Sequence, residues 1–107
     1  MTLFIMKVNS DTEIEEFISS LEAYTIAKAL RTIDLLEEFG SSLGMPHSKK
    51  VAAHIFELRI RGKQEVRLFY CFHKSEIRLL NGFVKKSEKT PKRELQKATN
   101  KYNILVA

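Results

Sequence analysis

Basic side chains stand in or just after three apolar runs in the second half of the sequence. Arg59 and Arg67 each lie inside such a run, and Lys85 and Lys86 follow directly after the third. The planar guanidinium of arginine can bind two phosphate oxygens at once, and lysine supplies a mobile point charge. If these four residues meet in the folded chain, they can hold a phosphate group and stabilise the negative charge that develops on phosphorus when a nucleic acid backbone is cut.

Cleavage of RNA needs few further groups, because the 2′-hydroxyl of the RNA is itself the nucleophile. The protein must then orient that hydroxyl, assist proton transfer and stabilise charge. A magnesium-dependent nuclease needs a carboxylate cluster. The acidic residues here are concentrated in the first half at helix-surface spacings, so we expect no metal site and no cofactor.

Histidine is the usual proton shuttle, and the chain has His47, His54 and His73. His47 and His54 stand close enough to the predicted strands to reach a basic sheet face, whereas His73 ends a strand. No two of them have metal-site spacing, and none stands beside an orienting carboxylate, so we favour structural roles for all three.

The charge of the chain is divided unevenly along its length. The net charge of +5 combines −5 in residues 1–44, from three basic and eight acidic residues, with +10 in residues 45–107, from fifteen basic and five acidic residues. A domain with its positive charge gathered in one half carries a positive field on one side. This field favours a polyanion such as nucleic acid as the partner.

Composition and length fit one globular domain over residues 1–107, with 44% apolar and 29% charged residues. The first residues do not resemble a secretion signal, and no apolar run has the roughly 18 residues that span a bilayer. We therefore expect a cytoplasmic protein that does not bind membranes. The single cysteine, Cys71, lies in the run LFYCF and is expected to act as a small buried hydrophobe.

The first half predicts a strand followed by a helical hairpin. LFIMKV (residues 3–8) reads as a strand, which could lie on a sheet edge, and Ser10 stands three residues before Glu13, the spacing of a capping box. Gly40 is suited to the end of the second helix. Apolar residues at helical spacing form the two predicted inner faces: Ile14, Phe17, Ile18 and Leu21 in the first helix, and Ile26, Ala29, Leu30, Ile33, Leu36 and Phe39 in the second.

The second half predicts a loop, three strands and a helix. GSSLGMPHSKK (residues 40–50) has loop composition, and strands are predicted at 55–61, 65–73 and 76–84. Their short connections predict an antiparallel meander. Thr90 is expected to cap a helix that has Pro91 at its first position and runs to about Tyr102. The final ILVA reads equally as a strand or as an apolar tail.

Strand alternation divides the meander into two faces. Val66, Leu68, Tyr70 and Phe72 are expected to face the helical hairpin. Arg59 and Arg67 then lie on the opposite face, which we expect to be wet and basic. Phe69 is expected to pack in the core, whereas Phe83 could equally pack or stack on a splayed RNA base.

The order of these motifs resembles the HigB branch of the RelE/ParE superfamily, which comprises toxins of type II toxin–antitoxin systems. The resemblance rests on ELR at 57–59, VR at 66–67 and GFVKKSEKTP at 82–91. The acidic hairpin with its closing LLEEFG at 35–40 agrees in layout. The likeness extends over nearly the whole chain, although its specific motifs lie in the second half.

The resemblance implies an α+β domain with a RelE-like fold, in which an N-terminal strand and a helical hairpin pack on a twisted antiparallel sheet and a short helix ends the chain. It also implies an mRNA endonuclease that acts on the ribosome without a metal. Arg67 and Lys86 would stabilise charge at phosphorus, and Arg59 and Lys85 would position the backbone. Further RNA contacts are assigned to Lys49, Lys50, Arg61, Lys63, Phe83 and Lys89. The implied protein partner is a helix-turn-helix antitoxin of the HigA or Xre type.

Two departures from the family pattern affect proton transfer. Many relatives read LLHGF where this chain has LLNGF, so Asn81 replaces a histidine. Some members also carry a tyrosine near the start of the last helix, whereas no tyrosine stands between residues 71 and 101 here. Two other functions fit the same sequence features. One is inhibition of DNA gyrase by a ParE-like protein, and the other is a non-catalytic module that binds RNA or protein.

Overall fold

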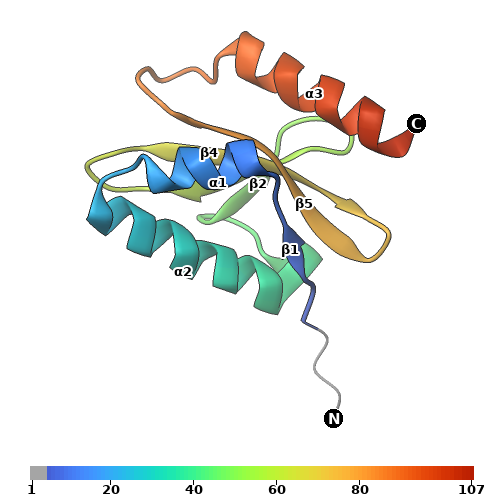
Figure 1. The fold of residues 1–107 in the computed structure, drawn as a ribbon, viewed down its shortest axis with the longest axis horizontal. Helices are drawn as coiled ribbons and strands as arrows, with labels where there is room; N and C mark the ends of the chain where they lie inside the picture. Colours follow the sequence, from blue (N-terminus) through green and yellow to red (C-terminus); the bar gives the residue numbers. More distant parts are fainter. Residues whose placement is uncertain (1–4) are drawn as a thin grey trace.

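The computed structural model describes residues 5–107 as an α+β domain, and the predicted fold class is confirmed (Figure 1). Its five-stranded sheet has the order β1-β5-β4-β3-β2. The helices are α1 (Thr12–Ser19), α2 (Ala23–Phe39), the 3-10 turn η1 (Gly40–Ser42) and α3 (Lys92–Val106). The strands are β1 (Val8–Asn9), β2 (Ser48–Lys50), β3 (Phe56–Ile60), β4 (Val66–His73) and β5 (Glu76–Val84).

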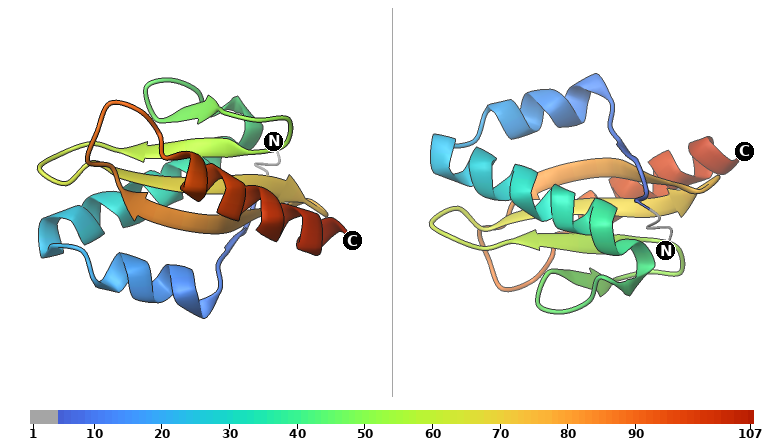
Figure 2. Two further views of the ribbon diagram at one scale, coloured as in Figure 1. Left: turned by 90° about the horizontal axis from the view of Figure 1, so that it is seen from above. Right: turned by 90° about the horizontal axis from the view of Figure 1, so that it is seen from below.

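The sheet lies between two helical layers. Helices α1 and α2 cover one face, and α3 crosses the other (Figure 2). Apolar side chains of α1 and α2 and of the facing strand residues form the larger core. Its fully buried members include Ile14, Leu36, Leu58, Leu68 and Ile77. None of the helices in the described part of the chain is long and apolar enough to cross a membrane.

The predicted antiparallel meander is confirmed for β3, β4 and β5. Lys74 and Ser75 form the β4–β5 turn with φ of 50° and 64°, the pair of positive angles that a type I′ hairpin turn requires. The other end of the meander, between β3 and β4, is the five-residue connection 61–65. The short connections between successive strands therefore account for this part of the topology.

The two edge strands differ from the sequence prediction. Of the predicted strand 3–8, residues 3 and 4 lie outside the described residues, residues 5–7 are not in a strand, and only Val8–Asn9 pairs with β5. The pairing is parallel, so the sheet is mixed rather than purely antiparallel. On the opposite edge, β2 forms at Ser48–Lys50, where the sequence predicted a loop.

The helix ends also differ in detail. The N-cap of α1 is Asp11, whose Oδ1 accepts from the Ile14 backbone N–H at 3.0 Å, so the expected Ser10–Glu13 capping box is wrong. In α2 the buried positions include Thr25 and Thr32, whereas Leu30 and Phe39 are about half exposed. The helix ends as predicted at Gly40, whose φ is 53°.

The position of helix α3 shows that the expectation of a fully solvent-exposed second sheet face was wrong. Its apolar side covers the second sheet face, where Phe69, Cys71, Leu80 and Phe83 are buried against Ala98. The face opposite the hairpin is therefore not wet along its whole length, because α3 shields most of β4 and β5. The helix continues to Val106, so the final apolar residues are helical, neither strand nor free tail.

A bulge in β5 decides which side chains meet α3. The β4–β5 register shifts between Phe69 and Tyr70, which pair with Asn81 and Leu79. The extra residue, Leu80, exchanges the two faces of β5 beyond it. Phe83 thereby lies in the α3 cluster, and Gly82 lies against Leu68 and Phe17, which leave no space for a side chain.

Candidate functional site

Five of the basic side chains line one pocket at the uncovered end of the sheet. Its volume is about 470 Å³. The lining comes from β3, from the β3–β4 connection, from the start of β4 and from the segment after β5, and its residues are Arg59, Arg61, Glu65, Arg67, Lys85, Lys86, Ser87 and Glu88. We call this the cationic pocket. The four residues that the sequence singled out for phosphate chemistry all contribute to it.

The two arginines at the centre of the cationic pocket are cross-strand partners. Arg59 on β3 pairs directly with Arg67 on β4. Like charges in such positions repel each other. Here the carboxylate of Glu57 lies between them, because its Oε1 is 3.6 Å from the Nε atoms of both Arg59 and Arg67. The pair is thus held together by a buried counter-charge.

Arg67 is not the solvent-directed side chain that strand alternation predicted. Its side chain is only 2% exposed. Its Nη1 donates to the Val66 carbonyl at 3.0 Å and to Glu65 Oε2 at 3.1 Å. The open end of the pocket is instead formed by the better exposed side chains Arg61 and Lys86.

Glu65 is the second carboxylate in contact with the arginines. Its Oε2 contacts Arg67 Nη1 and lies 3.8 Å from Arg61 Nε. Unlike Glu57, it is 36% exposed, and it lines the cationic pocket. An arriving phosphate would therefore compete with Glu65 for the same N–H groups.

The segment 85–91 is attached to the sheet from two sides. The Lys85 backbone N–H donates to the Glu65 carbonyl at 2.6 Å. Further along, the Thr90 hydroxyl donates to Glu57 Oε2 at 3.3 Å, so Thr90 does not cap α3 as predicted. Pro91 is the N-cap residue of that helix rather than its first helical residue. Thr90 thus joins the two-lysine segment to the arginine pair.

The remaining predicted RNA contacts are distributed less uniformly. Arg61 lines the cationic pocket, whereas Lys63 and Lys89 are exposed on the neighbouring connections. Lys49 pairs with Glu57 in the β2–β3 register and shares its sheet face. The adjacent Lys50 lies on the other face, where its Nζ is 6.0 Å from the centroid of the Phe56 ring.

Phe83 is buried rather than available for stacking. It is 7% exposed, and its ring centroid lies 5.4 Å from that of Phe69. The expected core position of Phe69 is confirmed. The alternative that Phe83 presents an aromatic face to a base is wrong, because the β5 bulge places the Phe83 side chain under α3.

None of the three histidines, all within the described residues, lines the cationic pocket. His54 stacks on Tyr102 of α3 with ring centroids 5.1 Å apart. Asn81 is buried and donates to the Glu94 carbonyl and to Glu94 Oε2. Within residues 5–107 there is also no group of three or more His, Cys, Asp or Glu arranged to hold a metal.

Glu57 is a residue of the site that sequence reasoning did not single out. Strand alternation assigns it to the polar face as an ordinary surface partner of the arginines, yet it is 3% exposed. The one available signal is its position two residues before Arg59, which puts both side chains on the same face of β3. Its Oε2 accepts from the Thr90 hydroxyl in the segment after β5, and strand alternation carries no information about that contact.

The fold and the pocket define a small α+β protein with a recessed cationic site. Residues 16–103 match the model of the family described as Phage derived protein Gp49-like (DUF891). The match covers most of the chain, and the chain therefore belongs to this family. It is a RelE-like family associated with the toxins of toxin–antitoxin systems. No curated protein matches the chain.

Proposed function

We propose that the chain is the toxin of a type II toxin–antitoxin system and that it acts in the cytoplasm as a HigB-type, ribosome-dependent mRNA endonuclease. The observation that carries this proposal is the meeting of Arg59, Arg67, Lys85 and Lys86 on one pocket from three separate segments. Membership in the Gp49-like family supports the toxin assignment.

In the proposed reaction the 2′-hydroxyl oxygen of one nucleotide attacks the adjacent phosphorus. The bond from phosphorus to the 5′-oxygen of the next nucleotide breaks, the 2′-hydroxyl loses its proton and the departing 5′-oxygen gains one. The products are a 2′,3′-cyclic phosphate and a 5′-hydroxyl. Arg67 and Lys86 stabilise the added charge on the phosphate oxygens, and Arg59 and Lys85 hold the backbone in line. The reaction as proposed uses no metal.

The proposed substrate is mRNA in the ribosome, and the charge of the pocket fits a strand of closely spaced phosphates. The proposed protein partner is a helix-turn-helix antitoxin encoded beside the toxin. Co-expression of that neighbour is expected to restore growth. Continued growth arrest in its presence would show that the neighbouring protein is not the antitoxin.

The direct test is induced expression in bacteria followed by mapping of RNA 5′ ends. We expect growth arrest and new ends within translated reading frames. Lys86→Ala is expected to abolish these ends. Lys7→Ala, which changes an exposed lysine beside β1 and outside the lining of the pocket, serves as the matched control and should retain them.

The same experiment separates the other functions. Intact transcripts combined with blocked DNA supercoiling would replace the proposal with gyrase inhibition. Intact transcripts and normal supercoiling, with RNA still bound by the purified protein, would indicate a non-catalytic binding module.

A further inference from the structure

Glu57 is a buried carboxylate directly behind the cationic pocket, and the proposed chemistry does not use it. Only 3% of the residue is exposed. Each of its oxygens contacts a different part of the site. Oε1 faces the Nε atoms of Arg59 and Arg67, both at 3.6 Å, and Oε2 accepts from the Thr90 hydroxyl at 3.3 Å.

The Nε atoms of both arginines are buried, and neither has a hydrogen-bond partner among the described residues. Each faces the same Glu57 oxygen. A buried charged group without compensation is strongly unfavourable. The Glu57 carboxylate is therefore the counter-charge that both Nε atoms face.

Through its contact with Thr90, Glu57 is also linked to the segment that carries the lysines. Thr90 belongs to the segment 85–91, which carries Lys85 and Lys86 and is also attached at Lys85 to the Glu65 carbonyl. The Thr90 contact ties the far end of that segment to β3. One carboxylate is thus the common neighbour of two strands and of the segment that completes the pocket.

We propose that Glu57 is a positioning residue that sets the arrangement of Arg59, Arg67 and the segment 85–91 for a tetrahedral phosphate. The role in cleavage rests on the proposed function, whereas the role in phosphate binding does not. Glu57 is negative, so charge alone makes it unfavourable to an anion. A positioning role predicts the opposite sign, because its removal would weaken phosphate binding although the site becomes more positive.

The test uses Glu57→Gln with inorganic phosphate as the probe and nuclear magnetic resonance of isotope-labelled protein as the readout. In the parent protein, the Nε–H signals of Arg59 and Arg67 should exchange slowly with water and should shift when phosphate is added. In Glu57→Gln we expect at least tenfold faster exchange, and several-fold more phosphate should be needed for the same shift. Unchanged exchange, or tighter phosphate binding, would overturn the proposal.

Glu13→Gln is the matched control, because it makes the same change in charge at an exposed ion pair on α1. It should leave the arginine signals and the phosphate titration as in the parent protein. If Glu13→Gln weakens phosphate binding as much as Glu57→Gln does, the effect is not specific to position and the proposal fails.

Cleavage kinetics give a second readout. Misplacement of reacting groups by about 1 Å can cost about a hundredfold in rate. We therefore expect kcat of Glu57→Gln to fall by about ten- to a hundredfold, with a much smaller change in KM for RNA. A parent protein that does not cut mRNA on translating ribosomes would refute the proposed function, and the phosphate titration would still decide the role of Glu57.

A third variant keeps the proposal testable if Glu57→Gln does not fold. Thr90→Val removes only the contact to Oε2 and leaves both arginine contacts. The Nε–H signals should then stay protected, while the phosphate-induced shifts of the Lys85 and Lys86 amides should decrease. Unaltered shifts at both lysines would contradict the link through Thr90 and with it the proposal.

Discussion

At the scale of single residues, the basic side chains of the cationic pocket have different physical roles. Arg67 is almost fully buried and has two carboxylate neighbours, so it is part of the folded core as well as of the pocket. Lys86 is exposed and lines the same pocket without a described ion pair. Substitutions at these two positions should therefore separate stability from phosphate binding.

Arg67→Ala should remove cleavage and also destabilise the fold, contrary to the expectation from strand alternation. Removing one member of a buried ion pair costs about 3–5 kcal/mol of folding free energy. Because Glu57 keeps its contact with Arg59 in this variant, we expect a cost near the lower end, about 3 kcal/mol. Lys86→Ala should remove cleavage with a stability change within about 0.5 kcal/mol. Urea unfolding of both variants measures the difference, and equal stability of the two would show that Arg67 is not part of the core.

At the scale of the elements, close packing between α1 and β5 depends on a single glycine. A Cβ atom at Gly82 would lie 2.6 Å from Leu68 Cδ2 and 2.7 Å from Phe17 Cε2. These atoms belong to a tightly packed interface of the larger core. The glycine therefore permits the close approach of α1 to the sheet.

Gly82→Ala should destabilise the protein by about 1–3 kcal/mol, the usual cost of overpacking. Gly44→Ala is the control, because a Cβ atom at Gly44 would have no neighbour within 4 Å, and it should change stability by less than about 0.5 kcal/mol. Thermal unfolding of the two variants compares them. Similar melting temperatures would indicate that the hairpin can move away from β5 at little cost.

Helix α3 is attached to the start of α1 by exposed ion pairs. Lys97 Nζ lies 2.6 Å from Glu13 Oε1, and Lys101 Nζ lies 3.6 Å from both Glu13 Oε2 and Asp11 Oδ2. The hydrogen bond from Lys97 and the charge of Lys101 lower the pKa of Glu13 below its ordinary value of 4.5. The same hydrogen bond raises the pKa of Lys97 above 10.5.

The pKa shifts of Glu13 and Lys97 define the pH range in which their ion pair stabilises the folded state. A lowered carboxylate pKa stabilises the folded state above about pH 4.5 and loses this effect as the pH falls through the folded pKa. The raised pKa of Lys97 stabilises the folded state below about pH 10.5, and this stabilisation is lost as the pH rises through the folded pKa. Lys97→Ala should therefore lower the melting temperature at neutral pH but not at strongly acidic pH. Lys92→Ala, on the same helix, should show no such pH-dependent difference, and a constant effect of Lys97→Ala at every pH would contradict the ion-pair explanation.

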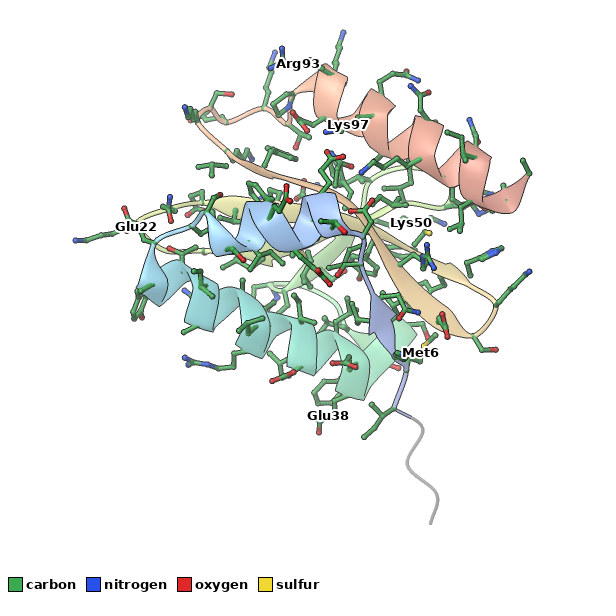
Figure 3. All side chains as sticks on the ribbon, viewed as in Figure 1. Met6, Glu22, Glu38, Lys50, Arg93 and Lys97 are labelled. Carbon is green, nitrogen blue, oxygen red and sulfur yellow. The ribbon has the colours of Figure 1, made fainter. Side chains whose placement is uncertain are left out.

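At the scale of the whole molecule, the uneven charge along the chain becomes a separation in space. The acidic residues of the first half belong mainly to the layer of α1 and α2, and α3 with the neighbouring segment carries many of the basic ones. Figure 3 shows Arg93 and Lys97 on the α3 side and Glu38 on the α2 side. A polyanion should therefore approach the protein with a preferred orientation.

The salt dependence of RNA binding tests how many phosphates this surface holds. Each phosphate contact with a single strand contributes about −0.7 to the slope of log affinity against log salt concentration, so five cations give at most about −3.5. Lys86→Ala should make the slope shallower by about 0.7, whereas Lys7→Ala should leave it unchanged. Equal slopes for all three proteins would place the RNA outside the cationic pocket.

Much of the fold was predictable, because it depends on short-range patterns. The periodicities of α1, β3, β4 and β5, the helix end at Gly40 and the turn at Lys74 and Ser75 are each determined by residues close in the chain. The short β1 and β2 were predicted poorly, because edge strands of two or three residues gain little from their own sequence and form by pairing with a longer neighbour.

The order of basic residues and apolar runs along the chain was enough to predict that the cationic side chains could meet at a sheet. Folding of the whole chain decided three further features: Arg67 is buried, Glu57 lies between the two arginines, and Thr90 contacts Glu57 rather than capping α3. It also decided that Phe83 is core, because one extra residue in β5 exchanges the strand faces. These outcomes depend on contacts between residues far apart in the chain, such as the 33 positions from Glu57 to Thr90, which local periodicity does not encode.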